Sequence, residues 1–419
     1  MNPLEYKLSG GALFYAIIVI LLLSLFSSGF ILLNRLWFVE NALFLKNTEL
    51  NDNLDSVDQW LRAEPGIVQA GQAKELDLFG DSSMVRIEAQ SWGLLRLIKS
   101  SARWRSLTIK RNTLYSGVNN KGCALYLSDN NKFLSLVGKC QIKGDCSLPT
   151  LGIRAGEMDG VSFIGIKMID GLISKSSNTL PKLSPELLQS WYGYRDASFG
   201  STDSIVSINS LTQNPDCTVS FNSNTLVIDC ESDGYLQNVN LSGNIIVAST
   251  GKITISSSAQ LQDILVFAKT IQVANDVHGS FQLFARDQLI VGDNCRLRYP
   301  SFAVCLADQT SPKITIGKNS VISGGVLIDS VNENPIPGRL EMTEGNKLTG
   351  MVYVNGEVGF AGQIDGGLYC NRFFISTPRG YYENFLKDAV INSESVLARF
   401  GSFSIDNAPD QLKLVKLCL

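Results

Sequence analysis

Four aspartates in the second half of this 419-residue chain have a spacing that could serve hydrolysis: Asp263, Asp276, Asp287 and Asp293. Glycoside hydrolases use two carboxyl groups about 5–9.5 Å apart. Asp276 and Asp293 occupy nearly the same position in successive units of a repeating pattern, so stacked units would place them about 4.8 Å from each other. The pair could act in a retaining glycosidase or bind calcium. Alternatively, both residues lie there because Asp favours turns, and we favour this second interpretation.

Other catalytic chemistry has few candidate residues. The single histidine, His278, lies in the turn-like segment ANDVHGS, where a solvated turn residue is the simpler interpretation. No two cysteines have the C-x-x-C spacing that is typical of structural zinc sites. The chain also lacks phosphate-binding and nucleophile-elbow motifs. We therefore predict no catalytic, metal-binding or cofactor-binding residues, and no cofactor.

The nine cysteines leave at least one thiol without a partner in the chain. The best candidates for a disulfide are Cys217 and Cys230, which begin and end the segment CTVSFNSNTLVIDC. An antiparallel hairpin with its turn at residues 222–225 would place them opposite each other. In an oxidising compartment such a pair could bond, whereas in a reducing one both would be small buried residues. The sequence leaves the two possibilities open.

One dense group of basic residues lies close to Trp92 and Trp104. It could bind anionic lipid, polysaccharide or nucleic acid, or it could be the solvated face of a sheet, which we favour. The net charge of −3 argues against nucleic acid as a partner, because nucleic-acid-binding domains carry a clearly basic face. The basic residues of this group are Arg96, Lys99, Arg103, Arg105, Lys110 and Arg111.

An uncharged apolar segment spans residues 10–33, and the rest of the chain is organised around it. Roughly 20 apolar residues cross a bilayer as a helix, so we expect a single span there, with the lipid bilayer as its partner. A cleaved signal peptide has a shorter apolar core. Apolar residues recur at helical spacing as far as Leu61, and no proline follows the span before Pro65. Residues 1–64 are therefore predicted to form a transmembrane helix and an amphipathic stem.

The water-facing body is predicted to be mainly β. Residues 65–196 would form a first β-rich unit with early coils of a β-helix, ending in a polar segment with a short helix at Ser184-Pro185-Glu186-Leu187. Residues 197–380 would form the main repeat. Residues 381–419 would form a C-terminal cap, because the last coil of a repeat needs a polar cover.

The repeat consists of apolar triplets spaced 18, 18, 25, 26 and 18 residues apart, with a second apolar stretch between successive triplets. Each unit is thus expected to be strand, turn, strand, turn. Stacked units would bury continuous apolar columns, which predicts a parallel β-helix, or β-solenoid. The alternative is a set of antiparallel β-sandwich domains, whose strands recur every 8–12 residues. The triplets begin at Ile253, Ile271, Leu289, Ile314, Leu340 and Val358, and the second stretches at Asn244, Ile264, Phe281, Phe302, Gly325 and Met351.

Two parts of the chain resemble known families. The segment GGALFYAIIVI resembles the N-terminal helix of type IV pilin-like and pseudopilin-like proteins, although residues 12–20 lack the glutamate that this family carries near the helix start. The segment SLVGKCQIKGDCSLP and the repeat at residues 245–360 resemble bactofilin-type polymer-forming proteins. The whole chain is similar to bacterial envelope proteins that join a pilin-like stem to a β-helix. This resemblance implies an envelope location and a structural role.

The expected function is that of a membrane-anchored structural protein of the cell envelope: a pilin-like, scaffold or adhesin-like subunit without catalytic activity. Its body would be periplasmic or extracellular, and its partners would be other envelope proteins or further copies of the chain. Two alternatives remain. One is a membrane-tethered carbohydrate-active enzyme that uses Asp276 and Asp293, and the other is a polymerising scaffold on the cytoplasmic side.

Overall fold

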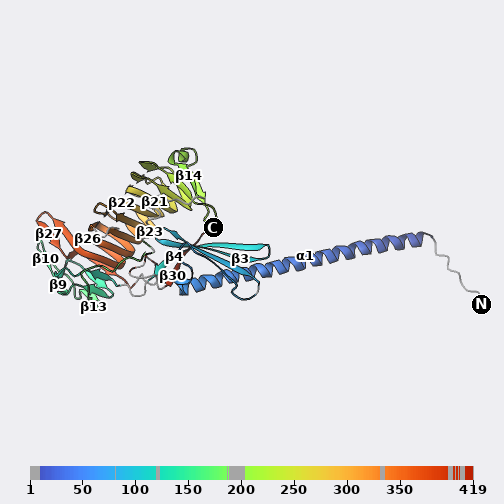
Figure 1. Cartoon of the computed structure of the whole chain (residues 1–419), viewed down its shortest axis with the longest axis horizontal. Helices are drawn as coiled ribbons and strands as arrows, with labels where there is room; N and C mark the ends of the chain where they lie inside the picture. Colours follow the sequence, from blue (N-terminus) through green and yellow to red (C-terminus); the bar gives the residue numbers. More distant parts are fainter. Residues whose placement is uncertain are drawn as a thin grey trace, which may run out of the picture. The chain divides into compact units, whose positions relative to one another are not determined.

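The chain begins with one long helix, which in the described residues is followed by strands, two short 3-10 helices and a helical stretch at residues 185 and 187 (Figure 1). This computed structural model describes residues 10–80, 82–118, 123–185, 187, 203–330, 336–394, 400–401, 403, 405 and 411–418. The chain divides into two compact units. One contains the helix as far as Val57 together with residues 75–86 and 101–110, and the other contains the rest.

Helix α1 (Gly10–Ala63) is 54 residues long. It ends just before Pro65, which begins the 3-10 helix η1 (Pro65–Ile67). A proline lacks the backbone N–H that would continue the helix and disfavours helical geometry in the residue before it, so the end of α1 follows from the sequence. The predicted helix through the span and the stem is confirmed.

The two halves of α1 differ in burial. The large apolar side chains of residues 13–45 are exposed. In contrast, Leu50, Leu54, Val57 and Leu61 are at most 1% exposed. These four recur at i, i+4, i+7 and i+11 and therefore lie on one face of the helix.

A five-stranded sheet has the order β1-β2-β3-β4-β30. The last strand pairs antiparallel with β4, placing Leu414 opposite Tyr115. The C-terminal strand therefore completes a sheet that the N-terminal strands begin, and the whole solenoid is inserted in the chain between β4 and β30. These strands are β1 (Ala73–Leu76), β2 (Met84–Trp92), β3 (Leu95–Trp104), β4 (Leu107–Val118) and β30 (Gln411–Cys418).

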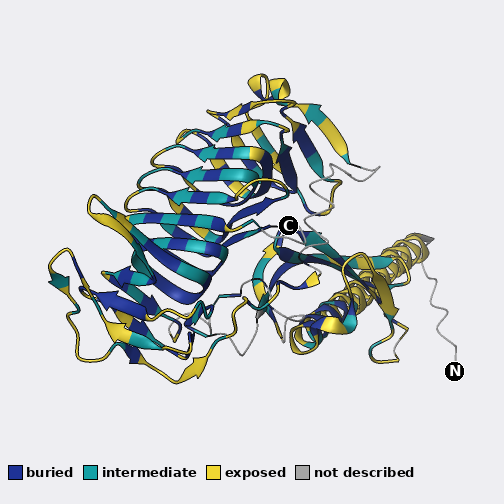
Figure 2. Ribbon diagram, turned by 60° about the vertical axis from the view of Figure 1, so that its left-hand side comes forward, coloured by how far each residue is buried: buried dark blue, intermediate teal, exposed yellow. Residues whose placement is uncertain are grey.

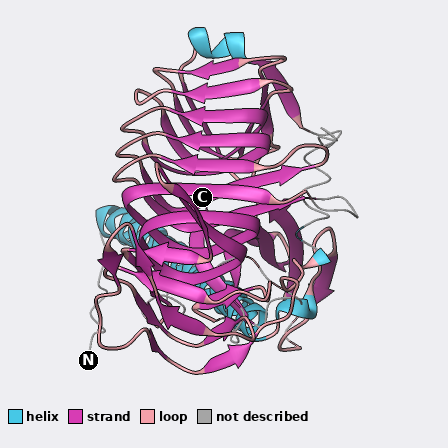
Figure 3. Cartoon of the chain, turned by 90° about the vertical axis from the view of Figure 1, so that its left-hand side faces the viewer, coloured by secondary structure: helices cyan, strands magenta, loops and turns pink. Residues whose placement is uncertain are grey.

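Most of the remaining strands form a parallel β-solenoid of about 11 turns, as predicted (Figure 3), while β10 pairs antiparallel with β11 and β27 antiparallel with β26. The antiparallel sandwich is excluded as the main architecture, because successive coils pair in parallel. The early strands are β5 (Leu125–Leu127), β6 (Leu134–Val137), β7 (Gln141–Lys143), β8 (Cys146–Leu148), β9 (Ile153–Ala155), β10 (Glu157–Met158), β11 (Val161–Ser162), β12 (Ile169–Asp170) and β13 (Ile173–Lys175).

The main stack begins with β14 (Ser204–Ser207) and the 3-10 helix η2 (Ile208–Thr212). Several later strands are long because they bend from one side of the coil to the next without leaving the sheet. They are β15 (Asp216–Val219), β16 (Leu226–Asp229), β17 (Gly234–Leu236), β18 (Asn240–Gly243), β19 (Ile245–Ala248), β20 (Lys252–Ile255), β21 (Gln260–Val273), β22 (His278–Val291), β23 (Arg296–Ala307), β24 (Lys313–Ile316), β25 (Val321–Ser330), β26 (Gly338–Thr377), β27 (Gly380–Glu383), β28 (Phe385–Lys387) and β29 (Ala389–Asn392).

Each coil has three strand segments, not the two that were predicted. The predicted triplets form one column, in which Ile253 pairs with Ile271, and the second apolar stretches form another, in which Ile246 pairs with Leu265. The third column was missed because most of its strands have a single inward apolar side chain between polar neighbours. Its inward positions include Leu241, Leu261, Leu297, Ile322 and Leu348.

The column of second stretches is buried on both sides. Its inward residues join the solenoid core, and its outward residues join a second apolar cluster with Trp92, Leu95 and Leu183 from outside the coils. Figure 2 shows the long strands of the solenoid as largely buried. Strands buried on both faces are expected to be continuous apolar runs rather than alternating ones. This explains runs such as ILVFA and FAVCLA. The outward residues in this cluster include Ile246, Leu265, Phe267, Phe284, Phe302, Val304 and Leu327.

The coils do not stack in the order of the chain. Strand β5 pairs with β26 through Leu125 and Leu368, and β7 pairs with β29 through Ile142 and Ile391. Residues 123–175 therefore continue the spiral where residues 389–392 leave it. The C-terminal cap predicted for residues 381–419 is wrong in this respect, because β28 and β29 lie inside the stack and β30 lies in the five-stranded sheet.

Two further local predictions have different outcomes. The antiparallel hairpin predicted for residues 217–230 is wrong, since β15 pairs in parallel with β18 and β16 in parallel with β19. The segment supplies two consecutive strands of the coil instead of a ribbon beside it. The short helix predicted at Ser184-Pro185-Glu186-Leu187 is present at the described residues 185 and 187, while residue 186 lies outside the described part of the chain.

Candidate functional site

The exposed half of α1 is the first candidate functional element. This helix is long and apolar enough to cross a membrane, and none of its most apolar window is buried. At a rise of about 1.5 Å per residue, the predicted span of residues 10–33 is roughly 36 Å long. The apolar core of a bilayer is about 30 Å thick, so the length suffices with some tilt.

Asp276 and Asp293 lie at the corner between two strand columns, but they are not equivalent residues of successive coils. The backbone N–H of Asp276 donates to the carbonyl of Asp293 (2.9 Å). The Asp293 carboxylate accepts the N–H of Lys318 in the next coil (2.7 Å), and the Asp293 N–H donates to the side chain of Asn275 (2.9 Å). The Asp293 side chain thus links the corner of its own coil to that of the next.

The backbone at Asp276 is left-handed (φ 61°), as it is at Asn294 and Asn319 in the next two coils. Asp and Asn tolerate this conformation better than most residues. The residue equivalent to Asp276 in the next coil is therefore Asn294. The predicted pairing of Asp276 with Asp293, 17 residues later, is shifted by one residue. The corner geometry agrees with the turn interpretation that the sequence favoured.

The other two candidate aspartates take part in contacts within the fold. The side chain of Asp263 is buried and forms an ion pair with Lys416 of β30 (2.6 Å), and the Asp263 carbonyl accepts the indole N–H of Trp92 (3.0 Å). Asp287 accepts a hydrogen bond from Thr310 (2.8 Å).

His278 is exposed and is the first residue of β22, where it pairs with Arg296 of the next coil. It therefore begins a strand rather than lying within a turn. In the described residues, no group of three or more His, Cys, Asp or Glu side chains is arranged to hold a metal ion.

Cys217 and Cys230 are both free thiols. Cys217 pairs with Leu241 in the neighbouring coil, while Cys230 follows β16 and is 3% exposed. Burial raises the pKa of both thiols, that of Cys230 to about 12. The opposed geometry that suggested a disulfide is wrong, because it depended on the antiparallel hairpin.

The basic residues on β3 and β4 do not act as one group. Arg96 donates to the carbonyl of Pro65 (2.8 Å), and Arg111 pairs with Asp58 (3.0 Å). Arg105 lies over the ring of Trp104 (4.6 Å), while Arg103 and Lys110 are exposed. Half of the basic residues thus have contacts inside their own unit.

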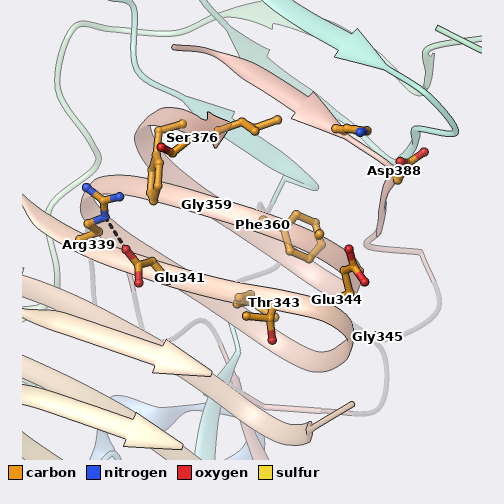
Figure 4. A pocket seen from close by; sticks show the side chains of 15 residues that line it. Arg339, Glu341, Thr343, Glu344, Gly345, Gly359, Phe360, Ser376 and Asp388 are labelled. Carbon is orange, nitrogen blue, oxygen red and sulfur yellow. Dashed lines mark hydrogen bonds and ion pairs between the residues drawn. The ribbon is translucent and has the colours of Figure 1, made fainter. Parts of the chain in front are cut away.

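A groove on the outside of the solenoid was not anticipated from the sequence. It has a volume of about 610 Å³ and lies over β26 and the segment joining β28 to β29 (Figure 4). The half-buried Gly359 and Ala361 alternate along β26 with the buried Val358 and Phe360; the small Ala361 keeps the floor low, and the ring of Phe374 lies over Gly359. The groove is lined by Arg339, Glu341, Met342, Thr343, Glu344, Gly345, Gly359, Phe360, Ala361, Gly362, Phe374, Ile375, Ser376, Lys387 and Asp388.

One wall of the groove is an ion-pair network that runs across successive coils. Glu341 accepts from Arg339 (2.8 Å) and pairs with Lys313 (2.9 Å). Arg339 also approaches Glu357 (3.7 Å), and its guanidinium lies 3.9 Å above the ring of Phe374. That ring fits only because residue 359 is glycine, since a Cβ there would lie 2.7 Å from it.

Sequence patterns could have pointed to this groove through one signal. The triplet VGF at residues 358–360 has glycine where the other triplets have a polar or branched side chain. A small outward residue in a strand column leaves room for a side chain of a neighbouring coil, which here is the ring of Phe374. Comparison of the chain with protein-family models, curated proteins and solved structures finds no match.

Proposed function

We propose that this protein is a membrane-anchored structural component of the cell envelope, with its body in the periplasm or outside the cell. It would act as a pilin-like, scaffold or adhesin-like subunit. The observation that carries the proposal is the exposed apolar surface of residues 13–45 in the same continuous helix whose later residues are buried. Such an extended apolar surface is costly in water and requires a lipid or protein environment.

A structural role for the body is supported by its architecture. The coils pair through continuous parallel ladders and enclose one apolar core. About 11 turns at roughly 4.8 Å per turn give a rod of the order of 50 Å. A rod of this kind would serve as a spacer or as a surface for envelope partners.

The proposal of a non-catalytic body is supported by the roles of the candidate acids. The Asp293 carboxylate accepts a backbone N–H of the next coil, and Asp276 adopts a left-handed backbone conformation at the corner. Asp263 and Asp287 have partners within the fold. Each of these residues therefore has a physical role that does not require a substrate.

Membrane fractionation of the full chain tests the anchor. We expect the protein in the membrane pellet after an alkaline carbonate wash and its release by detergent. Replacing Leu22 and Phe26 by arginine should shift most of the protein out of this pellet, because each arginine at the centre of a span costs about 2.5–3.5 kcal/mol. The matched Leu22→Ala/Phe26→Ala variant should stay in the membrane. Recovery of the unmodified protein in the soluble fraction would refute the anchor.

A further inference from the structure

The groove over β26 has the features of a ligand site rather than of a packing defect. Its side chains come from strand segments of different coils, here called rows, which form two walls. Glu341 and Thr343 lie on one row and Ser376 lies on another (Figure 4). It spans at least three successive rows, or about 10 Å. A ligand that fills it is therefore elongated.

The charges that line the groove do not favour an ion. Two cations, Arg339 and Lys387, face three carboxyl groups, Glu341, Glu344 and Asp388. The best-defined of them pair with each other or with the fold: Arg339 with Glu341 (2.8 Å), and Asp388 with the backbone N–H of Lys139 (2.9 Å). A strongly charged ligand would meet a like charge at one wall or the other. A neutral ligand avoids this cost.

The polar groups nevertheless offer many hydrogen bonds in fixed positions. Arg339 and Glu341 hold each other in place, so little side-chain entropy is lost when a ligand binds to them. Ser376 adds a hydroxyl group that both donates and accepts, and Thr343, whose hydroxyl donates to the carbonyl of Ile316 (3.1 Å), adds an acceptor. Sugar hydroxyls, which also donate and accept, match such a lining.

Apolar surface lies between these polar groups. Ala361 and the unsubstituted backbone of Gly362 contribute to the groove, together with the small exposed parts of Phe360 and Phe374, each of which is 5% exposed. The alternation of apolar surface with fixed polar groups fits a molecule that presents C–H faces and hydroxyl edges in turn. We propose that the groove binds a neutral oligosaccharide.

Titration of the full-length protein with oligosaccharides tests this proposal. The protein is held in a detergent without a sugar headgroup and titrated calorimetrically with neutral glucan, mannan, xylan and chitin oligomers. Uronate oligomers and a polar peptide of mixed charge serve as comparison ligands. We expect at least one neutral oligomer to bind and the uronates and the peptide to bind at least ten-fold more weakly.

A filled groove is the decisive variant. Ala361→Trp places a large side chain on the groove floor at an outward position and should weaken binding at least ten-fold. Gln272→Trp is the matched control, because Gln272 is also an outward, half-buried residue of the triplet column, several coils away. It should change the affinity less than two-fold, and circular dichroism should show that both variants fold.

Three results would overturn the proposal: no neutral oligomer binds, the uronates or the peptide bind more tightly, or Ala361→Trp binds as well as the unmodified protein. The outcome is separate from the fate of the membrane anchor. A protein that fractionates as soluble could still bind in this titration, and a protein without a ligand could still be anchored.

Discussion

Asp293 and Asp276 differ in what their corner position requires of them. The carboxylate of Asp293 is a hydrogen-bond acceptor for Lys318, while Asp276 provides a left-handed backbone. Asp293→Ala should therefore lower the free energy of unfolding by about 1–2 kcal/mol. Asp293→Asn should leave it nearly unchanged, because its amide oxygen can accept the same bond.

At Asp276 the expected pattern of substitutions is different. Asp276→Ala should cost about 1 kcal/mol through the left-handed conformation, and Asp276→Gly should cost little. Urea unfolding followed by circular dichroism measures all four variants. Equal destabilisation by Asp293→Asn and Asp293→Ala would contradict the corner role. It would indicate that the charge of the carboxylate, and not its hydrogen bond to the next coil, stabilises the fold.

The sequence could supply the turn preference of these residues but not their partners. Asp and Asn at residues 275, 276, 293 and 294 mark a corner in each coil. Which of them has a side chain that bonds to the next coil depends on the register. A shift of one residue exchanges the position whose side chain makes this bond for the position that has the left-handed backbone. The same limit applies to Cys217 and Cys230, whose symmetric spacing suggested a hairpin that the parallel register overrides.

At the scale of elements, a buried polar contact connects α1 with β4. Tyr115 donates from its hydroxyl to Asp58 (2.6 Å), and Arg111 donates to the other oxygen of the same carboxylate (3.0 Å). Tyr115 is fully buried. Tyr115→Phe removes one hydrogen bond to a charged group and should lower the free energy of unfolding by about 1.5–3 kcal/mol.

The contribution of Tyr115 should also depend on pH. Burial, and then the hydrogen bond and the charge of Asp58, raise the pKa of Tyr115 above its ordinary value near 10. Below about pH 10 the hydroxyl is protonated in both the folded and the unfolded chain, so its stabilisation is complete. As the pH rises above 10 the unfolded chain ionises first, and the stabilisation is lost.

Urea unfolding at pH 7, 9 and 11, in detergent, measures this dependence. The advantage of the unmodified protein over Tyr115→Phe should be constant from pH 7 to 9 and smaller at pH 11. Tyr235→Phe is the control, since Tyr235 is 53% exposed, and it should have little effect at any pH. An advantage that persists unchanged at pH 11 would refute the role assigned to Tyr115.

Some helices and strands could be predicted from local sequence patterns and others could not. The helix through Leu61 and the triplet column were predictable, because each repeats an apolar period over many residues. The column with a single inward residue per strand, such as Leu241 or Leu297, has no period of two to detect. The groove depends on Gly359 and Phe374, whose contact is made only when two coils stack.

At the scale of the whole molecule, the order of the coils departs most from what sequence patterns can indicate. A repeat suggests that each coil contacts the next one along the chain. Here Ile391 pairs on one side with Ile364 and on the other with Ile142, a residue near the beginning of the body. No local pattern distinguishes this closure from a free last coil, because both bury the same apolar side chains.

This closure predicts that a defect at Ile391 spreads to a distant part of the chain. Ile391, Ile364 and Ile142 are all fully buried, so Ile391→Ala leaves a cavity and should cost about 2–5 kcal/mol. Because stability in a solenoid passes between neighbouring coils, hydrogen exchange should accelerate in β7 at residues 141–143 as well as at residues 362–365. Ile253→Ala is the matched control, since Ile253 is equally buried and pairs with Gly234 and Ile271. It should accelerate exchange at residues 234–236 and 271–273 and leave β7 unchanged. Exchange in β7 that is the same in Ile391→Ala as in the unmodified protein would mean that the early coils do not continue the C-terminal end of the stack.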